Sequence, residues 1–556
     1  MSSSSSPGRN EKVLFWASFF TLIAAGIGFS VRGFILKDWG NQFGFTQSEL
    51  GTITGGGLIG FGIAIIFFSF CADQFGYGKL MLVAFLLHAS SAIVTFAATP
   101  VYGMYGKEGA YWCLYIGMWL FALGNGTCEA VINPLTATLF PRNKTHWLNI
   151  LHAGWPLGLI LGAAIGLVFK FSLPDLRWEF KLGVFLVPVL LYGLMMFGRA
   201  FPHSEAKSSG VSMGTMVLSL LSPILLFLFV LHALVGYVEL GTDSWIVNIT
   251  DRVLKDETKA LLAFIWTNAL MFTLRFFAGP IVERINPVGL LFVSALLGTA
   301  GLFMLGQPFT NEVWLWMAAV SVYGLGKTFY WPTMLGVISE RFPKGGALAL
   351  GISGGLGMIS AGLLGGPGIG YKQDYFAVQK LKELSLPTYE RYAAPKASGF
   401  PVFSSVAPDA LPPVAGLDNG KLKVFDDWSG VIDESGNRKE GKKTTLESDI
   451  ETVARLEAEG KPAGKELKES LEGLKKWWDK DGQANYAADK EKLSEARLYG
   501  AKQALLYTAV VPAALAAGFL LLILYFMVTG GYKQVHLESE RPHRAAGGAP
   551  AEDWGR

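Results

Sequence analysis

One carboxylate stands in the middle of a long apolar stretch of the sequence. Glu129 lies within "GNGTCEAVINP" (residues 124–134), with Asn125 four residues before it and Asn133 four residues after it. Residues with this spacing lie on one face of an α-helix, so the three side chains form a polar stripe. Because burial disfavours the charged carboxylate, Glu129 is suited to bind and release protons near neutral pH. The competing interpretation is a structural ion pair between helices.

Other polar and aromatic residues also fall inside apolar segments. A charge at the centre of a bilayer costs roughly 2.5–3.5 kcal/mol, so it usually faces a cavity or a partner. The predicted substrate-binding residues are Arg32 at the outer mouth, Asn125, Glu129, Asn133, His152, Trp155, Glu239, Asn268, Lys327, Tyr330 and Trp331. Glu239 joins Glu129 as a proton-coupling candidate. Lys327 is expected either to pair with Glu129 or to hold a substrate anion.

These residues must be positioned by membrane helices. Hydrophobic residues make up 51% of the 556-residue chain and charged residues 16%, and apolar blocks of about 20 residues, enough to cross the hydrocarbon layer, recur along most of it. The sequence therefore predicts an all-α membrane protein with twelve transmembrane helices in two pseudo-symmetric six-helix bundles. The predicted helices cover residues 13–36, 48–70, 79–98, 111–140, 147–171, 179–199, 214–246, 258–281, 288–307, 312–341, 346–370 and 500–528.

The Lys and Arg residues of the short loops favour two cytoplasmic termini. The predicted order is a cytoplasmic tail (1–12), the N-terminal bundle (13–199), a central cytoplasmic loop (200–213), helices 7–11 (214–370), an extracytoplasmic insert (371–499), helix 12 (500–528) and a cytoplasmic tail (529–556). The expected location is the cell membrane, which is the inner membrane in a Gram-negative bacterium.

The insert is polar and rich in charge. Its first half is predicted to be an extended loop, and "KLKVFDDWSGVIDESGNRK" (421–439) a hairpin. Residues 445–461 and 463–482 have a helical period with interleaved charges. No catalytic or metal motif occurs there. A cap or a domain that binds a protein partner is expected, with a hidden enzyme or a solute-capturing module as the alternatives.

Two pairs of segments suggest an internal repeat. Residues 122–141 align without gaps on 324–343, which places Asn125 opposite Lys327 and Glu129 opposite Trp331. Residues 71–81 resemble residues 280–290, with Glu283 as the counterpart of Asp73 after a shift of one residue. Two related halves of six helices fit a transporter whose site lies near the midplane.

The segment "SFCADQFGYGKLM" (69–81) resembles the loop between helices 2 and 3 of the Major Facilitator Superfamily. Asp73 and Gly76 match its Gly-x-x-x-Asp-Arg-x-Gly-Arg-Arg/Lys pattern, and Lys79 provides a basic residue one position after its end, whereas Ser69 and Gln74 depart from it. Such a loop can lock one state of two rocking bundles. The lock residues implied by this motif and its second copy are Asp73, Lys79, Glu283 and Arg284, and Arg275, one turn before Gly279 of the second copy, is assigned to the same lock.

Residues 129–162 resemble a narrower branch, the fucose–galactose–glucose proton symporters. Glu129, Asn133 and Pro134 match its helix-4 pattern, and Pro141, Leu148 and Asn149 match the following segment. The resemblance implies that Glu129 takes part in sugar binding and proton coupling. Gly33 stands near the place of that branch's helix-1 acid, and His152 and Trp155 replace its helix-5 amides. These departures favour an anionic substrate.

Several function classes lack support in the sequence. Clustered Lys/Arg stripes for nucleic acid and a phosphate-binding loop for ATP do not occur, and no cofactor or metal is expected. Cys71, Cys113 and Cys128 have no paired spacing and are interpreted as buried small residues. We expect a monomeric secondary transporter, not an enzyme, that moves a sugar, sugar acid or other carboxylate by proton-coupled uptake. The alternatives are an exporter or antiporter of this fold, and a receptor that binds through the insert.

Overall fold

The computed structural model describes residues 8–43, 57–173, 176–397, 411–433, 435–458 and 465–537, together with residues 45, 50, 53, 399, 400, 404, 409 and 460. Within these residues the regular structure is helical, apart from two isolated bridges, Ala393–Leu417 and Ile432–Arg438. The prediction of an all-α protein is therefore confirmed. Predicted features in residues 1–7 and 538–556, and in the gaps around residues 44–56 and 398–410, lie outside the described residues.

The first half of the chain forms a bundle around α5. Its helices are α1 (Arg9–Phe43), α3 (Gly57–Phe75), α4 (Tyr77–Phe96), α5 (Ala98–Leu139), α6 (Lys144–His152), α7 (Gly154–Ser172), α8 (Trp178–Gly183) and α9 (Leu186–Met196). Two of the predicted membrane helices are each divided into two helices, α6 with α7 and α8 with α9. Two short helices follow in the central loop, α10 (Glu205–Ser208) and α11 (Met213–Ser219).

The second half forms another bundle. Its helices are α12 (Pro223–Leu254), α13 (Glu257–Arg275), α14 (Ala278–Leu305), α15 (Val313–Lys327), α16 (Tyr330–Arg341), α17 (Gly346–Ser360), α18 (Gly366–Leu384), α24 (Gln483–Thr508) and α25 (Val510–Val528). Short 3₁₀ turns precede α15 (Pro308–Asn311) and α17 (Pro343–Gly345), and a π-helical turn (Ala361–Gly365) joins α17 to α18.

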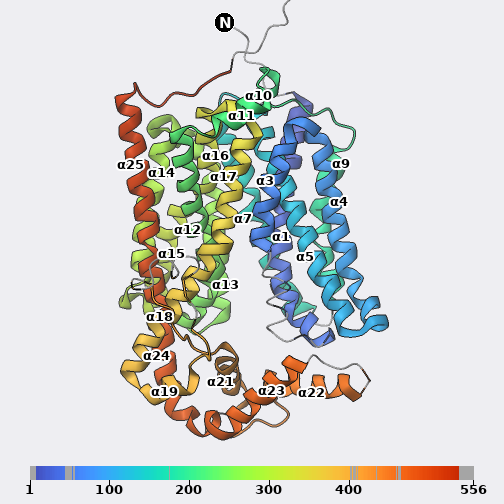
Figure 1. Cartoon of the computed structure of the whole chain (residues 1–556), viewed down its shortest axis with the longest axis vertical. Helices are drawn as coiled ribbons and strands as arrows, with labels where there is room; N and C mark the ends of the chain where they lie inside the picture. Colours follow the sequence, from blue (N-terminus) through green and yellow to red (C-terminus); the bar gives the residue numbers. More distant parts are fainter. Residues whose placement is uncertain are drawn as a thin grey trace, which may run out of the picture.

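The two bundles stand side by side, and the described ends of the chain lie together at one end of the molecule (Figure 1). We call this the terminal end, and the opposite end, where the insert lies, the insert end. Between the bundles, α3 packs against α17, α6 against α16 and α7 against α13. Sites formed at these contacts therefore draw on both halves of the chain.

In the described part of the chain, nine helical segments are long and apolar enough to cross a membrane. The three predicted spans outside this group are α5, α13 and the pair α15–α16, and all three are helical. Each of the twelve predicted spans therefore corresponds to a helical segment in the described residues. Nine of these segments also meet the length and hydropathy criteria. The other three contain Glu129, Arg275 and Trp331, which are central to the site described below.

The internal repeat has a structural counterpart. Phe140 ends α5 with φ −127° and ψ 62°, and Phe342 ends α16 with φ −126° and ψ 53°. Each Phe is followed by a proline, Pro141 or Pro343, and by the next helix of its bundle. The aligned segments thus end in the same way, as expected of repeated units.

The insert is helical and has its own hydrophobic core. Besides the extensions of α18 and α24, it contains α19 (Leu386–Tyr392), α21 (Asn419–Val431), α22 (Thr445–Ala458), α23 (Lys465–Trp477) and a π-helical turn (Trp478–Gly482). Phe425, Leu471, Trp478 and Leu493 are among its buried core residues. The two predicted insert helices are confirmed as α22 and α23. Because α18 and α24 pack along each other, the predicted boundaries at 370 and 500 fall inside continuous helices.

The predicted hairpin at 421–439 is wrong. Residues 419–431 form α21, whose first turn is capped by Asp418, and the pairing of strands is limited to the short Ile432–Arg438 bridge. In α21, Leu422 and Phe425 lie one turn apart and both enter the insert core. Helical spacing of the apolar residues therefore prevails over the β-branched and aromatic content of the segment.

Glycines allow close helix contacts in the C-terminal bundle. A Cβ atom at Gly236 of α12 would lie 1.9 Å from the carbonyl oxygen of Gly357 in α17. Real Cβ atoms cannot approach a backbone oxygen so closely, so any side chain at residue 236 must push the two helices apart. Gly33 of α1 has open space at the same position.

We expect Gly236→Ala to lower the thermal stability of the detergent-solubilised protein by about 1–3 kcal/mol, the usual cost of overpacking. Alanine is the better helix former by roughly 1 kcal/mol, so a loss would come from packing alone. Thermal unfolding measures the effect, and Gly33→Ala is the matched control, expected to be neutral or slightly stabilising. Equal stability of the two variants would contradict the packing of α12 on α17.

Candidate functional site

A small cavity lies between the two bundles. Its lining residues are Glu129, His152, Trp155, Glu239, Leu240, Arg275, Trp331 and Met358. They come from α5, α6 and α7 of the first bundle and from α12, α13, α16 and α17 of the second. The cavity has a volume of about 20 Å³, close to the minimum that holds a water molecule. Five of the eleven predicted substrate-binding residues thus line one cavity: Glu129, His152, Trp155, Glu239 and Trp331.

Arg275 is the cation of this site and is fully buried. Its Nε donates to the carbonyl oxygen of Thr328 at 2.8 Å, and its Nη1 donates to the carbonyl oxygen of His152 at 2.6 Å. In an α-helix these carbonyls would accept from residues 332 and 156, but both are prolines and lack an N–H. Pro156 and Pro332 therefore leave one carbonyl in each bundle without its helical donor, and Arg275 donates a hydrogen bond to both carbonyls.

Glu239 of α12 provides the acidic partner of Arg275. Its Oε1 accepts from Nη2 of Arg275 at 3.4 Å, and its Oε2 is buried with no hydrogen-bond partner among the residues that the structure describes. Both side chains are almost completely buried, at 2% and 4% exposure. The sequence interpretation placed Arg275 in a cytoplasmic lock, whereas the structure places it at the centre, because the last residue of α13 turns towards the helix breaks in front of Pro156 and Pro332.

Glu129 begins a second polar chain on the opposite side of the cavity. Asn133 donates from Nδ2 to Oε2 of Glu129 at 2.6 Å and accepts at Oδ1 from Nε2 of His152 at 2.8 Å. Because the amide oxygen can only accept, this pairing places the His152 proton on Nε2. His152 Nε2 and Glu129 Oε2 are 4.0 Å apart. The predicted stripe of Glu129 and Asn133 therefore faces the site and connects to Arg275 through the backbone of His152.

Two tryptophans form aromatic walls of the cavity, and each directly precedes a proline. Trp155 stands before Pro156, and Trp331 before Pro332. His232 packs edge-on against Trp331 with ring centroids 4.6 Å apart, and its Nδ1 lies 2.5 Å from the Ser353 hydroxyl. The repeated Trp-Pro pair is a sequence signal for both the aromatic walls and the free carbonyls, and the sequence interpretation missed it.

Four of the predicted substrate-binding residues, Arg32, Asn125, Asn268 and Tyr330, do not line this cavity and bond elsewhere. Asn125 bonds to His88 at 3.0 Å, and the Tyr330 hydroxyl donates to the carbonyl of Ser294 at 3.1 Å. Asn268 bonds to the carbonyl of Phe264 within its own helix. Asn125 and Glu129 share a stripe only approximately, since four residues advance a helix by more than one full turn.

Arg32 is the fourth of these residues. Its Nη2 donates to the Ser91 hydroxyl at 3.1 Å, and its guanidinium carbon lies 3.8 Å from the centre of the Phe121 ring. The side chain is only 2% exposed. It therefore packs between α1, α4 and α5, and the predicted place at an outer mouth is wrong.

Lys327 pairs with Asp243 and not with Glu129. Its Nζ lies 2.5 Å from Oδ1 of Asp243, with side-chain exposures of 1% and 14%. Asp243 follows Glu239 by one turn on α12, so the pair lies next to the site, on its insert side. Only the folded structure reveals this partner, because the two residues are 84 positions apart along the chain.

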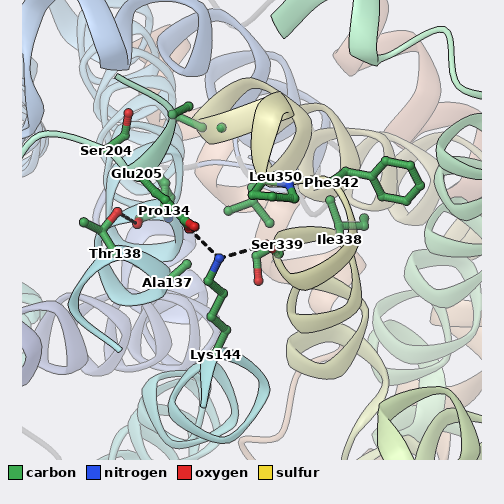
Figure 2. A pocket seen from close by; sticks show the side chains of 14 residues that line it. Pro134, Ala137, Thr138, Lys144, Ser204, Glu205, Ile338, Ser339, Phe342 and Leu350 are labelled. Carbon is green, nitrogen blue, oxygen red and sulfur yellow. Dashed lines mark hydrogen bonds and ion pairs between the residues drawn. The ribbon is translucent and has the colours of Figure 1, made fainter. Parts of the chain in front are cut away.

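The terminal end is closed by polar contacts between the bundles, several of which surround a second cavity (Figure 2). Lys144 of α6 donates to Glu205 of α10 at 2.5 Å and to the carbonyl of Ser339 in α16 at 3.1 Å. Lys144 is 1% exposed, so this ammonium joins the first bundle to the central loop and to the second bundle.

Glu340 of α16 makes the next connection. Its Oε1 accepts from the backbone N–H and the hydroxyl of Thr145 in α6, at 3.1 and 2.6 Å, and its Oε2 accepts from the Tyr532 hydroxyl at 2.7 Å. Val535 donates its N–H to the Glu340 carbonyl at 2.8 Å, and Gln534 donates to the carbonyl of Pro141. The segment after α25 thus crosses the closed end and bonds to both bundles.

The lock residues taken from the family motif differ in their surroundings. Asp73 is buried, and its carbonyl accepts from Lys207 at 2.7 Å. Lys79, Glu283 and Arg284 are exposed. The repeat aligned Asp73 with Glu283, but the two differ in burial. A charge next to the Phe-Pro end of each aligned segment, Lys144 and Glu340, would have been the better signal.

Comparison with known proteins identifies the architecture. Residues 18–370, more than half of the chain, match the model of the Major Facilitator Superfamily. A cis,cis-muconate transport protein of Acinetobacter baylyi is 25% identical over 198 residues, which are 35% of this chain and 45% of that protein. The match therefore spans less than half of this relative.

Solved structures show the same fold. The E. coli fucose:proton symporter FucP superposes with a TM-score of 0.53 at 16% identity, covering 66% of this chain and 93% of FucP. The E. coli xylose transporter XylE, in a partially occluded inward-open conformation, gives a TM-score of 0.51 at 16% identity, covering 64% and 91%. At these identities the likeness concerns the fold alone.

We expect Glu340→Ala to open the terminal end more often, because it removes three hydrogen bonds to a carboxylate, each worth about 1.5–3 kcal/mol. In a background without the native cysteines, Ala137→Cys places a thiol at the cavity of Figure 2. Its maleimide labelling rate should rise at least about tenfold in the Glu340→Ala variant. Glu283→Ala removes an exposed acid and is the control. An unchanged labelling rate would refute this role of Glu340.

Proposed function

Because the chain belongs to the Major Facilitator Superfamily, we propose that it carries a small organic carboxylate across the membrane by alternating access, as a proton-coupled uptake system. Membership of this family makes the chain a multi-pass membrane transporter and not an enzyme. The substrate, the coupling and the direction of transport are parts of the proposal.

The observation that carries the proposal is the state of Arg275 at the cavity. A guanidinium has five N–H donors in a plane, and three of them are used by Thr328, His152 and Glu239. One N–H on each terminal nitrogen remains. An N–H that no other group accepts can bond to a carboxylate oxygen, and Arg is the side chain that binds carboxylates most strongly through such donors.

Glu239 provides a reason for proton coupling. A substrate carboxylate at Arg275 would lie close to a second buried carboxylate, and two like charges in a buried site repel strongly. A proton that neutralises one carboxylate removes this repulsion and leaves Arg275 free for the substrate. Substrate and proton would then bind together, which is the requirement for symport.

Glu129 supports the same coupling from the first bundle. It faces the cavity, its one polar contact at 2.6 Å is with the amide of Asn133, and His152 lies 4.0 Å away. Uncharged amide and imidazole groups compensate a carboxylate less than a guanidinium does. Glu129 is therefore the acid of the first bundle that gains most from protonation when an anion enters.

The relative named as a muconate transport protein supports a carboxylate substrate, since muconate is a dicarboxylate. A neutral sugar is the second candidate. Trp155 and Trp331 line the cavity and present ring faces of the kind that pack on sugars. The fold shared with FucP and XylE, described as fucose and xylose carriers, is compatible with it.

Counterflow in proteoliposomes with a panel of monocarboxylates, dicarboxylates, sugar acids and neutral sugars decides between the two. We expect exchange of carboxylates, and Arg275→Lys should raise their half-saturation concentration at least about tenfold, because lysine lacks the planar pair of donors. Arg199→Lys changes an exposed arginine at the end of α9 and should have no effect. Exchange restricted to neutral sugars, unaffected by Arg275→Lys, would refute the carboxylate proposal.

A second experiment addresses Glu129. We expect uptake by the native protein to rise as the pH falls on the insert side, because protonation of a buried carboxylate favours entry of an anion. Glu129→Gln resembles the protonated form, so counterflow should persist while the pH dependence of dicarboxylate uptake flattens. Glu108→Gln, an exposed acid on the same helix, is the control. A pH profile as steep as that of the native protein would exclude Glu129 from coupling.

A further inference from the structure

Four buried or nearly buried charges form a ladder inside the second bundle, running from the cavity towards the insert end. We call Arg275, Glu239, Lys327 and Asp243 the charge ladder. Arg275 and Glu239 are 3.4 Å apart, and Lys327 and Asp243 are 2.5 Å apart. Glu239 and Asp243 are one turn apart on α12, and Glu239 also interacts electrostatically with Lys327. Each carboxylate therefore lies within the field of both cations.

The surroundings of Asp243 isolate the ladder from other charges. On α12 itself the neighbouring acid is Glu239, α13 contributes Arg275, and α15 contributes Lys327 and the Tyr323 ring. On α18, Lys372 lies over the Tyr237 ring and donates to the Thr508 hydroxyl at 2.6 Å, so its ammonium is held by other partners. Two cations thus balance two carboxylates, and the ladder is neutral.

A substrate carboxylate at Arg275 would disturb this balance. It adds a third negative charge to two positive ones in a site from which water is largely excluded, where an uncompensated charge costs several kcal/mol. One proton per added negative charge restores neutrality. The proton need not bind next to the substrate, because the ladder can shift its pairing by one step: Lys327 turns to Glu239, and Arg275 turns to the substrate.

We propose that Asp243 is the group that takes up this proton from the insert end, and that Lys327 acts as the positioning residue that passes the change on to Glu239 and Arg275. The inference rests on the proposed carboxylate transport. In the step, a hydronium ion on the insert side gives its proton to a carboxylate oxygen of Asp243 and leaves as water. No other bond is made or broken.

Exposure decides between the two acids of the ladder. The Asp243 side chain is 14% exposed, whereas Glu239 is 4% exposed. Asp243 also lies nearer the insert end, because α12 runs from the terminal end at Pro223 to the insert end at Leu254. Glu129 remains a separate acid of the first bundle, and a dicarboxylate, which adds a second negative charge, would require it or Glu239 to bind a second proton.

The test is made with the full-length protein in proteoliposomes and with a monocarboxylate that the native protein exchanges. In the native protein the half-saturation concentration for counterflow should rise with pH, and a gradient of one pH unit should drive accumulation on the order of tenfold, the equivalent of one proton. In Asp243→Asn, counterflow should persist with a half-saturation concentration that no longer depends on pH, and the gradient should drive less than about twofold accumulation.

Asp243→Glu keeps a carboxylate and should retain at least half of the native accumulation, so its loss would contradict the inference. Since Asp243→Asn leaves Lys327 buried without its partner, the double variant Asp243→Asn with Lys327→Gln keeps the ladder neutral and secures a folded protein. It should show the same loss of gradient-driven accumulation. Native accumulation in either folded variant would overturn the inference.

The proposed function and this inference fail in different ways. If the native protein exchanges no carboxylate at all, the proposed function is refuted. If it exchanges carboxylates, and the Asp243 variants still accumulate them with the native pH dependence, only the role of Asp243 is refuted.

Discussion

The interaction on which the site depends is the capture of Arg275 by two backbone carbonyls that prolines have left free. A buried guanidinium needs several acceptors, and one carboxylate at 3.4 Å supplies only part of them. Pro156 and Pro332 each remove one helical N–H, and the carbonyls of His152 and Thr328 take Arg275 as a substitute donor. A cation of the second bundle is thereby bound to the backbone of the first. When the bundles separate, the His152 contact must break, and Arg275 requires a new acceptor.

This requirement links the centre of the molecule to its ends. At the terminal end, Lys144 and Glu340 hold α6, α16 and the segment after α25 together. Between centre and end, α3 meets α17 through small residues: a Cβ atom at Gly62 would lie 2.7 Å from the carbonyl of Gly355. Small residues let α3 and α17 slide past each other easily. The polar contacts of Arg275 at the centre and of Lys144 and Glu340 at the terminal end, in contrast, are either made or broken. The architecture therefore favours a few discrete arrangements of the two bundles over a continuous range.

The sequence was sufficient for features that depend on local patterns. Apolar length predicted the helical segments, the helical period predicted α22 and α23, and the cost of a buried charge pointed to Glu129 and Glu239. It was insufficient wherever the answer depended on which face of a helix meets its own bundle. Arg32, Asn125 and Tyr330 are as polar or aromatic as the site residues, but they turn towards α4 or α14. The partners of Arg275 and Lys327 lie 123 and 84 residues away along the chain, and no local pattern identifies them.

The repeat explains why the two halves hold different charges at equivalent places. Glu129 and Trp331 occupy the same aligned position, and both line the cavity. Asn125 and Lys327, one turn earlier, both turn away from it, to His88 and Asp243. The backbone frame is thus shared, while the first bundle places an acid where the second places a ring. The second bundle instead brings its acids to the site from α12, already paired with Arg275 and Lys327. The second bundle therefore offers an anion two cations that are already balanced by two carboxylates. The first bundle offers Glu129, a carboxylate whose charge only a proton can neutralise. An anion that passes the site must therefore displace a carboxylate from Arg275 and also avoid repulsion by Glu129.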